Sequence, residues 1–183
     1  MAELAFISLG SNIDPESNLP QAVTRLRVIG RVVRVSTAYV NPAVGPRTQA
    51  DFVNAAALVE TSMSPIEIRT RLRQIESELG RVRHTDKYAP RTIDLDLCLL
   101  GERVESYPDW ALPDPDIDRL AHLAIPLAEV DPDFRHPRSR ETLQTIAERL
   151  RPSAQLTPHP AISLWPPAGL STAPEEVADT RQP

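Results

Sequence analysis

The sequence contains very little cysteine and few aromatic residues, and each shortage excludes a class of protein. Cys98 is the only cysteine among 183 residues, which rules out a disulfide framework and a cysteine-based zinc site. The 2 Trp, 3 Tyr and 3 Phe are too few for the exposed base-stacking sheet of an RNA-binding module. A net charge of −5 also argues against a nucleic-acid partner.

Long apolar runs are missing as well. No stretch approaches the roughly 18 apolar residues that span a membrane. The segment from Met1 to Gly10 lacks the basic start of a secretory signal. Together with the single cysteine, these features predict a cytoplasmic protein without a membrane partner. The hydrophobic fraction of 41% and the charged fraction of 25% are ordinary for a globular protein.

Proline separates the chain into a body and a tail. Of the 19 prolines, an unusual share falls between Pro152 and Pro183. We therefore predict one folded domain over residues 1–151 and an irregular Pro-rich tail over residues 152–183.

Hydrophobic patterning predicts the order β, α, β, β, α, β, followed by further helices. The predicted strands are residues 4–9, 32–40, 52–60 and 91–100. The predicted helices are a first one between its N-cap Asn18 and Gly30, and then residues 64–79, 119–130 and 139–150. This order is the ferredoxin-like βαββαβ pattern, an α+β fold with an antiparallel sheet and helices on one face, here with extra C-terminal helices and a tail.

The helix over residues 64–79 has the clearest pattern. Ser64 and Glu67 form a capping box at its start. Its apolar stripe consists of Ile68, Leu72, Ile75 and Leu79. The residues predicted on its opposite, polar face are Arg69, Arg73 and Glu76.

Two aspartates alternate with leucines in the strand that follows. Asp94 and Asp96 are two positions apart, so both side chains point away from the core and lie roughly 6.5–7 Å apart. Carboxylates at this spacing can bind Mg²⁺ together with phosphate oxygens. An ordinary amphipathic strand with one wet face has the same pattern, so the pair alone leaves both interpretations open.

Basic residues are concentrated just before this strand. Residues 69–91 contain six Arg and one Lys against three acidic residues. Arg81, Arg83 and Arg91 can converge on the aspartate pair, and arginine binds phosphate oxygens in a bidentate manner. For Arg69 and Arg71 we favour the alternative, a solvated helix face with local ion pairs.

At this point a family resemblance is clear. Arg81-Val82-Arg83, followed by Y-A-P-R-T-I-D-L-D-L from Tyr88 to Leu97, resembles the motif of 6-hydroxymethyl-7,8-dihydropterin pyrophosphokinase, a folate-pathway kinase. The runs that look like its opening strand, pterin-side loop and next strand are I-S-L-G-S-N at 7–12, P-A-V-G-P at 42–46 and Q-A-D-F-V-N at 49–54. The resemblance covers about residues 4–150. It implies the transfer of pyrophosphate from ATP to the hydroxymethyl group of the pterin, with release of AMP.

The resemblance also implies roles for individual residues. The implied catalytic residues are Arg81, Arg91, Asp94 and Asp96, and the two aspartates would hold two Mg²⁺ ions. The implied ATP contacts are Arg73, Glu76, Arg83, Tyr88 and Leu97. The implied pterin contacts are Asn41, Pro42, Val44, Phe52, Asn54 and His122. The expected partners are thus ATP and a hydroxymethyl pterin, bound by a monomer or weak homodimer.

Within residues 114–122, three positions depart from the usual pattern of the family. Asp114 stands where a His helps to bind ATP, and Leu120 stands where an Arg is directed at phosphate. His122 stands where a Phe stacks on the pterin. These changes leave two alternatives open: transfer to a different hydroxymethyl heterocycle, and a catalytically inactive paralogue that binds a nucleotide.

Overall fold

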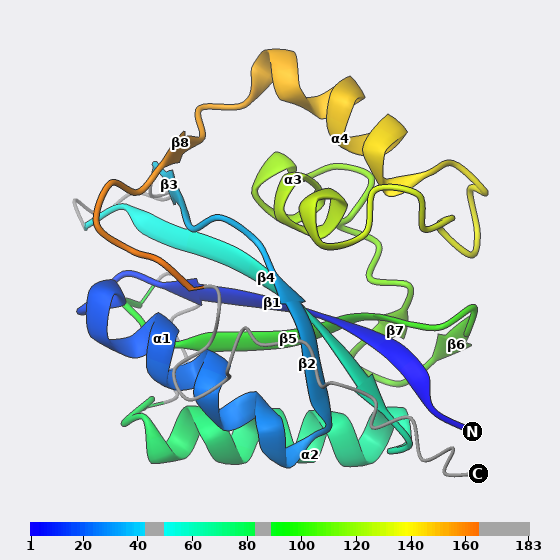
Figure 1. Ribbon diagram of the computed structural model, residues 1–183, viewed down its shortest axis with the longest axis horizontal. Coiled ribbons are helices and arrows are strands. Elements are labelled where there is room, and N and C mark those ends of the chain that lie inside the picture. The colour runs from blue at the N-terminus through cyan, green and yellow to red at the C-terminus, as the bar shows by residue number, and fades with distance from the viewer. Residues whose placement is uncertain (43–49, 83–88, 165–183) are drawn as a thin grey trace, which may run out of the picture.

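Figure 1 shows the computed structural model, an α+β fold with one main antiparallel sheet. The structure describes residues 1–42, 50–82 and 89–164. The strands of the main sheet are β1 (Glu3–Ser11), β2 (Arg31–Val35), β3 (Tyr39–Asn41), β4 (Phe52–Thr61), β5 (Asp94–Leu100) and β8 (Thr157–Pro158). The helices are α1 (Pro15–Arg25), α2 (Pro65–Glu78), α3 (Ala121–Val130) and α4 (Leu143–Leu150). Two 3₁₀ turns, Leu26–Val28 and Arg151–Ser153, and a hairpin of β6 (Glu105–Ser106) and β7 (Ala111–Leu112) complete the described elements.

Strands β1 and β4 form the centre of the sheet. They pair antiparallel from Glu3 opposite Thr61 to Ser11 opposite Val53. Strand β5 pairs with the other edge of β1, and β2 and β3 both pair with β4. Strand β8 adds to the edge of β3. The predicted α+β class is confirmed.

Helices cover both faces of this sheet, as Figure 1 shows. One core lies between the sheet and helices α1 and α2, and Ile7 belongs to it. A second core lies between the sheet and helices α3 and α4, and Phe6 belongs to that one. The prediction of helices on one face is therefore wrong for the whole domain, because β1 and β4 carry apolar side chains on both faces and the C-terminal helices bury the second set.

The predicted strand over residues 32–40 is interrupted. Strand β2 ends at Val35, and β3 begins only at Tyr39. Between them the Ser36 hydroxyl accepts a hydrogen bond from the backbone N–H of Ala56 at 2.8 Å, and a Glu129 carboxylate oxygen accepts one from the N–H of Thr37 at 2.8 Å. The N–H of Ser36 still donates to the carbonyl of Ala56 at 2.9 Å, but the side-chain bonds interrupt the regular pairing and break the strand in two.

Helix boundaries also differ from those that the pattern predicts. Asp14, with φ 45°, is the N-cap of α1, and Asn18 lies inside the helix, where its side-chain amide donates to the carbonyl of Ile13 at 2.7 Å. Helix α4 begins later than predicted, after the N-cap Thr142. By contrast, the capping box of α2 is present as predicted.

Strand β5 alternates as predicted up to Leu97. There Ile7 pairs with Leu97, whereas Phe6 pairs with Leu99, so Cys98 is an extra residue in β5. Such a bulge reverses the side-chain alternation beyond it. Leu99 consequently packs in the second core rather than in the first, where the alternation predicts it.

Residues 152–164, the first part of the predicted tail, pack against the domain. Strand β8 pairs with β3, and the backbone N–H of His159 donates to the carbonyl of Ala38 at 2.8 Å. Leu164 is only 4% exposed and belongs to the first core. The part of the predicted tail at 165–183 lies outside the described residues. Within the described residues, none of the helices combines the length and the apolar character that crossing a bilayer requires.

Candidate active site

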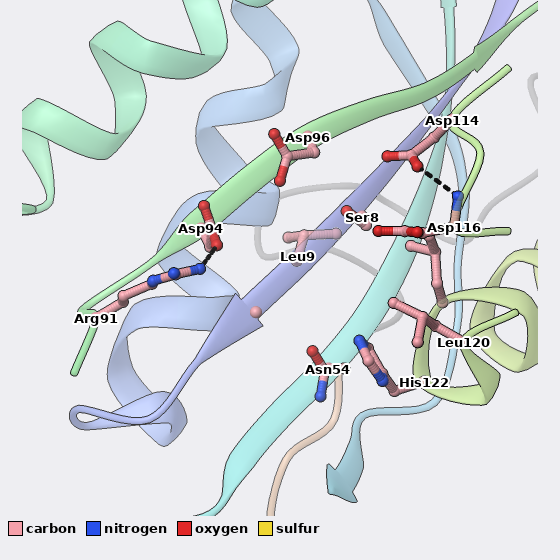
Figure 2. A pocket seen from close by; sticks show the side chains of 12 residues that line it. Ser8, Leu9, Asn54, Arg91, Asp94, Asp96, Asp114, Asp116, Leu120 and His122 are labelled. Atoms are coloured by element: carbon pink, nitrogen blue, oxygen red, sulfur yellow. Dashed lines mark hydrogen bonds and ion pairs between the residues drawn. The ribbon is translucent and has the colours of Figure 1, made fainter. Parts of the chain in front are cut away.

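Strand β5 presents two aspartates at the end of the sheet where β1 and β4 also expose polar groups. Leu95 and Leu97 are 4% and 5% exposed and face the first core. Asp94 and Asp96 point to the other face, where Figure 2 shows them next to each other at the wall of a cavity. The predicted orientation of the pair follows from the period of two of the strand.

Asp94 lies between two arginines. Arg81 donates a hydrogen bond to Oδ1 of Asp94, and Arg91 donates one to Oδ2, as drawn for Arg91 in Figure 2. Arg81 also donates to Oε1 of Glu76 and, at 3.1 Å, to the carbonyl oxygen of Ile93. The family resemblance implies that this carboxylate is a metal ligand. In the structure the two guanidinium groups neutralise its charge.

Glu76 is buried beneath this pair, with only 2% of its surface exposed. Its Oε1 atom accepts hydrogen bonds from Arg81 and, at 2.9 Å, from the backbone N–H of Leu95. The prediction of Glu76 on the polar face of the helix is wrong. Glu76 follows the buried Leu72 by four positions, so it lies at the edge of the apolar stripe and needs partners in the protein.

Asp96 carries a negative charge that its surroundings disfavour. The side chain is exposed at the cavity, and the protein around it removes part of its hydration. This desolvation, followed by repulsion from Asp94, Glu76 and Asp114, raises the pKa of Asp96 to about 6, and Arg81 opposes the shift. A cation bound beside Asp96 would relieve this repulsion.

Two adjoining cavities meet at Asp96. The first has a volume of about 260 Å³, and its polar wall includes Ser8, Asn54, Arg91, Asp94 and His122. The second has a volume of about 370 Å³, and its wall includes Arg69, Leu97, Asp109, Trp110 and Pro115. The walls of both include Asp96, Asp114 and Asp116. A molecule in one cavity would thus meet a molecule in the other at the aspartates.

His122 separates the first cavity from a third one. Figure 2 shows His122 beside Asn54, away from Asp94. The third cavity, of about 220 Å³, lies behind His122 and is also lined by Asn41, Pro42 and residues 153–156. Burial lowers the pKa of His122, and the nearby Asp116 opposes the shift. Burial therefore favours the neutral imidazole.

The structure places most of the residues implied by the resemblance around these cavities. Arg81 and Arg91 contact Asp94, Leu97 lines the second cavity, and Asn41 and Pro42 line the third. Arg73 lies exposed on α2 and Phe52 lies half-buried at the start of β4. Among the described wall residues of the three cavities, neither of these two occurs. The residues outside the described ranges are Val44, Arg83 and Tyr88.

Sequence patterns miss several of the residues in these walls, and three of them, Asp116, Trp110 and Arg69, bear on the chemistry of the site. Asp116 and Trp110 lie in a segment for which the sequence predicts no helix or strand. Arg69 lies on a helix face that the sequence predicts to be solvated. The backbone N–H of Asp116 donates to Oδ1 of Asp114 at 2.8 Å, which holds the two acidic residues in one turn. The available signal was the acidic spacing Asp114-Pro115-Asp116, which repeats the spacing of Asp94 and Asp96.

The protein supplies only part of a metal coordination sphere. Across residues 1–42, 50–82 and 89–164, no three His, Cys, Asp or Glu side chains are grouped so that they could hold a metal ion. Mg²⁺ commonly binds through one or two carboxylates and completes its shell with water and substrate phosphates. Asp94 and Asp96 fit this mode of binding, since the repulsion around Asp96 favours a cation.

An α+β domain with two carboxylates, two arginines and two joined cavities has the parts of an enzyme that transfers phosphoryl groups from a nucleotide. Residues 6–132 match the family described as 7,8-dihydro-6-hydroxymethylpterin-pyrophosphokinase (HPPK). The chain belongs to this family, and the resemblance found in the sequence is confirmed.

Relatives agree with this membership, and a solved structure agrees with the fold. The chain is 35% identical over 176 residues to the 2-amino-4-hydroxy-6-hydroxymethyldihydropteridine pyrophosphokinase of Synechocystis sp., covering 94% of this chain and 87% of the relative. It is 38% identical over 133 residues to the Bacillus subtilis protein of the same name, covering 71% and 79%. A solved Plasmodium falciparum HPPK-DHPS, wild type with STZ-DHP, has a TM-score of 0.65 at 10% identity, covering 84% of this chain and 45% of that one. This chain thus spans less than half of that longer chain, and the likeness shows the fold alone.

Proposed function

We propose that the protein transfers pyrophosphate from ATP to 6-hydroxymethyl-7,8-dihydropterin and yields AMP and the pterin diphosphate, a step of folate biosynthesis. The observation that carries this proposal is the junction of two cavities at Asp96, with Asp94 and its partners Arg81 and Arg91 beside it. Relatives at 30% to 38% identity bear the name of this pyrophosphokinase, and the chain covers most of their length.

The first cavity is the proposed acceptor site. The side-chain Nδ2 of Asn54 is buried and has no hydrogen-bond partner within the described part of the chain, so it can donate to the edge of a heterocycle. The neutral imidazole of His122 can pack against the flat ring. An acceptor held in this way would direct its hydroxymethyl oxygen toward the two aspartates. The third cavity adds Asn41 and Pro42 as proposed contacts near the same ring.

The second cavity is the proposed ATP site. The acceptor hydroxyl loses its proton to solvent and its oxygen attacks the β-phosphorus; the bond from the β-phosphorus to the α,β-bridging oxygen breaks, and AMP leaves with that oxygen. Mg²⁺ bound by Asp94 and Asp96 would neutralise phosphate charge. Arg81 and Arg91 could then turn from Asp94 to the transferring phosphates, because chemistry of this kind depends on positioning and electrostatics. Arg83 and Tyr88 stay predicted ATP contacts, as do Arg73, Glu76 and Leu97.

A second candidate function is the same transfer to a different hydroxymethyl heterocycle. Two of the three residues that depart from the family pattern within residues 114–122, Leu120 and His122, line the acceptor cavity. The third, Asp114, lines both cavities, and desolvation raises its pKa. These positions alter the walls against which the acceptor packs, whereas the motif of aspartates and arginines is unchanged.

A product assay distinguishes these functions. The protein is incubated with Mg²⁺, ATP and 6-hydroxymethyl-7,8-dihydropterin, and AMP is separated from ADP. Acceptor-dependent AMP at roughly 0.1–10 per second supports the proposed reaction. ATP binding without AMP, followed by AMP with another hydroxymethyl heterocycle, supports the second candidate. ATP binding without AMP across acceptors indicates an inactive paralogue.

We also infer finer features of the molecule. The antiparallel order β5, β1, β4, β2 supports the ferredoxin-like arrangement of the split βαβ units. The packing of Leu164 supports a domain that extends beyond residue 151. Four features stay predictions from the sequence: two Mg²⁺ ions, a monomer or weak homodimer, the absence of a nucleic-acid partner and a cytoplasmic location.

A further inference from the structure

The charged residues in the wall of the second cavity are acidic except at one position. Its charged residues in the described part of the chain are four aspartates and one arginine, Arg69. A polyanionic nucleotide would meet four carboxylates in this wall. Arg69 is therefore the described wall residue that can attract it, and it lies at the cavity rather than on a fully solvated helix face.

Trp110 supports the side chain of Arg69 from one side. The Cζ atom of Arg69 lies 4.8 Å from the centroid of the Trp110 ring. The indole in turn stacks on Tyr107, with ring centroids 4.1 Å apart and an interplanar angle of 3°. The three side chains thus form a layered cluster, and a cation over an indole is held by electrostatic attraction.

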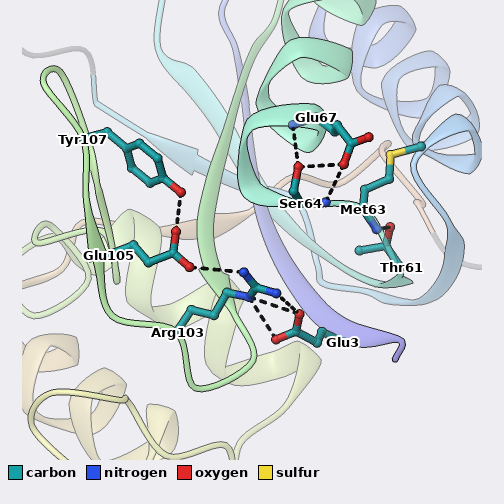
Figure 3. A network of polar contacts seen from close by, with 8 residues as sticks. All are labelled: Glu3, Thr61, Met63, Ser64, Glu67, Arg103, Glu105 and Tyr107. Carbon is teal, nitrogen blue, oxygen red and sulfur yellow. Dashed lines mark hydrogen bonds and ion pairs between the residues drawn. The ribbon is translucent and has the colours of Figure 1, made fainter.

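The hairpin that carries Trp110 is anchored to the main sheet, as Figure 3 shows. The Tyr107 hydroxyl donates to Glu105, and Glu105 pairs with Arg103 at 3.2 Å. Arg103 pairs in turn with Glu3 at the start of β1 at 2.6 Å. These contacts fix the position of the hairpin, and with it the indole against which Arg69 lies.

The position of Arg69 along α2 indicates which part of the nucleotide it faces. Glu76, which lies beneath Asp94 and Arg81, follows Arg69 by two helical turns, or about 10 Å along the axis. Arg69 consequently lies toward the end of the ATP cavity away from the transferring phosphates. A guanidinium group is planar and stacks on aromatic rings.

On the basis of the pyrophosphokinase function proposed above, we propose that Arg69 is a nucleoside-positioning residue, on whose guanidinium, backed by Trp110, the purine of ATP stacks. Replacement of Arg69 should therefore weaken the binding of ATP. It should not weaken the binding of a polyphosphate without a base. The affinity for the acceptor should also stay unchanged, because Arg69 does not line the first cavity.

The test compares Arg69→Leu and Arg69→Lys with the full-length wild-type chain. In Arg69→Leu, KM for ATP should rise about 3- to 30-fold, while kcat and KM for the pterin should stay within about twofold. Arg69→Lys should show a smaller rise, since it keeps the charge but loses the planar group. Arg71→Leu is the matched control, because Arg71 lies on the same helix, is exposed and contacts Gln74 at 3.2 Å.

Calorimetry supplies a readout that does not depend on turnover. The probes are Mg²⁺ with an ATP analogue whose α,β-bridge is methylene, and Mg²⁺ with inorganic tripolyphosphate. Arg69→Leu should weaken the binding of the analogue and leave the affinity for tripolyphosphate within about twofold of the wild type. An unchanged affinity for the analogue overturns the inference, and so does an equal loss for both probes, which would place Arg69 at the phosphates. If the wild type binds the analogue but releases no AMP from ATP in the product assay, the proposed function fails. The calorimetry then still decides the role of Arg69.

Discussion

The backbone N–H of Leu95 donates a hydrogen bond of 2.9 Å to Oε1 of Glu76. Leu95 lies between the two aspartates of β5, so this bond ties helix α2 directly to the strand that carries the candidate metal ligands. The same oxygen also binds Arg81. One buried carboxylate therefore sets the position of the strand and that of an arginine of the site.

Removal of the Glu76 carboxylate should destabilise the fold. Glu76→Ala leaves a buried amide and part of the charge of Arg81 without a partner, so the free energy of unfolding should fall by about 2 to 4 kcal/mol. Glu76→Gln keeps an acceptor for Leu95 and should lose less. Urea unfolding measures both, with Glu78→Ala as the control, because Glu78 is 48% exposed in its pair with Arg25. A loss in Glu76→Ala no larger than in the control would contradict the buried bonding.

The ionisation of Asp96 should lower the stability of the metal-free protein. Its pKa is about 6 in the folded state against 3.8 for the ordinary carboxyl, so folding becomes less favourable as pH rises through this window. With allowance for solvent screening, Asp96→Asn should be more stable than the wild type by about 1 kcal/mol at pH 8. The difference should shrink toward zero below pH 4.

Urea unfolding in EDTA checks the pH dependence of the Asp96 effect. Asp133→Asn, an exposed aspartate, should show no such difference. The addition of Mg²⁺ should then stabilise the wild type more than Asp96→Asn, because a ligand that binds only the folded state raises its stability. A constant difference between wild type and Asp96→Asn from pH 4 to pH 8 would refute the raised pKa.

Both aspartates of β5 should be essential for turnover but not for folding. Asp94→Ala and Asp96→Ala should each lower kcat/KM by about 10³-fold or more, since phosphate charge would no longer be neutralised at the site. Circular dichroism should still show a folded protein, and Asp133→Ala should retain activity. Full activity in either aspartate variant would remove the metal assignment.

Local sequence patterns predict the part of the site that depends on periodicity. Asp94 and Asp96 share a face because a strand has a period of two, and the capping box at Ser64 needs only four consecutive residues. The same reasoning places Glu76 on the wrong face, because a polar residue next to an apolar stripe is indistinguishable from a solvated one until its partners are known.

Contacts between distant segments are not predictable in this way. Arg69 and Trp110 meet only because the hairpin β6–β7 folds against α2, and neither residue belongs to the family motif. The wall behind His122 likewise needs residues 153–156, which follow α4 and run beside β3. Such contacts are set by the packing of the whole chain rather than by local preference.

The segment after α4 should contribute to stability through Leu164. This side chain is 4% exposed and packs in the first core, so Leu164→Ala should lower the free energy of unfolding by about 2 to 4 kcal/mol. The control is Ile66→Ala, since Ile66 is 61% exposed and should lose less than about 0.5 kcal/mol. Equal midpoints in urea for wild type and Leu164→Ala would show that the segment does not pack in solution.

His122 should determine how well the acceptor packs. Phe offers more apolar area to a flat heterocycle than imidazole, so His122→Phe should lower KM for 6-hydroxymethyl-7,8-dihydropterin by about 3- to 10-fold and leave KM for ATP unchanged. Because burial lowers the pKa of His122 and favours the neutral imidazole, the gain should differ little between pH 7 and pH 8.5. Steady-state kinetics measure KM for the pterin and KM for ATP. The control is His159→Phe, because His159 follows β8 and its backbone N–H donates to the carbonyl of Ala38. A higher KM for the pterin in His122→Phe, with a lower one for another hydroxymethyl heterocycle, would instead assign the cavity to that acceptor.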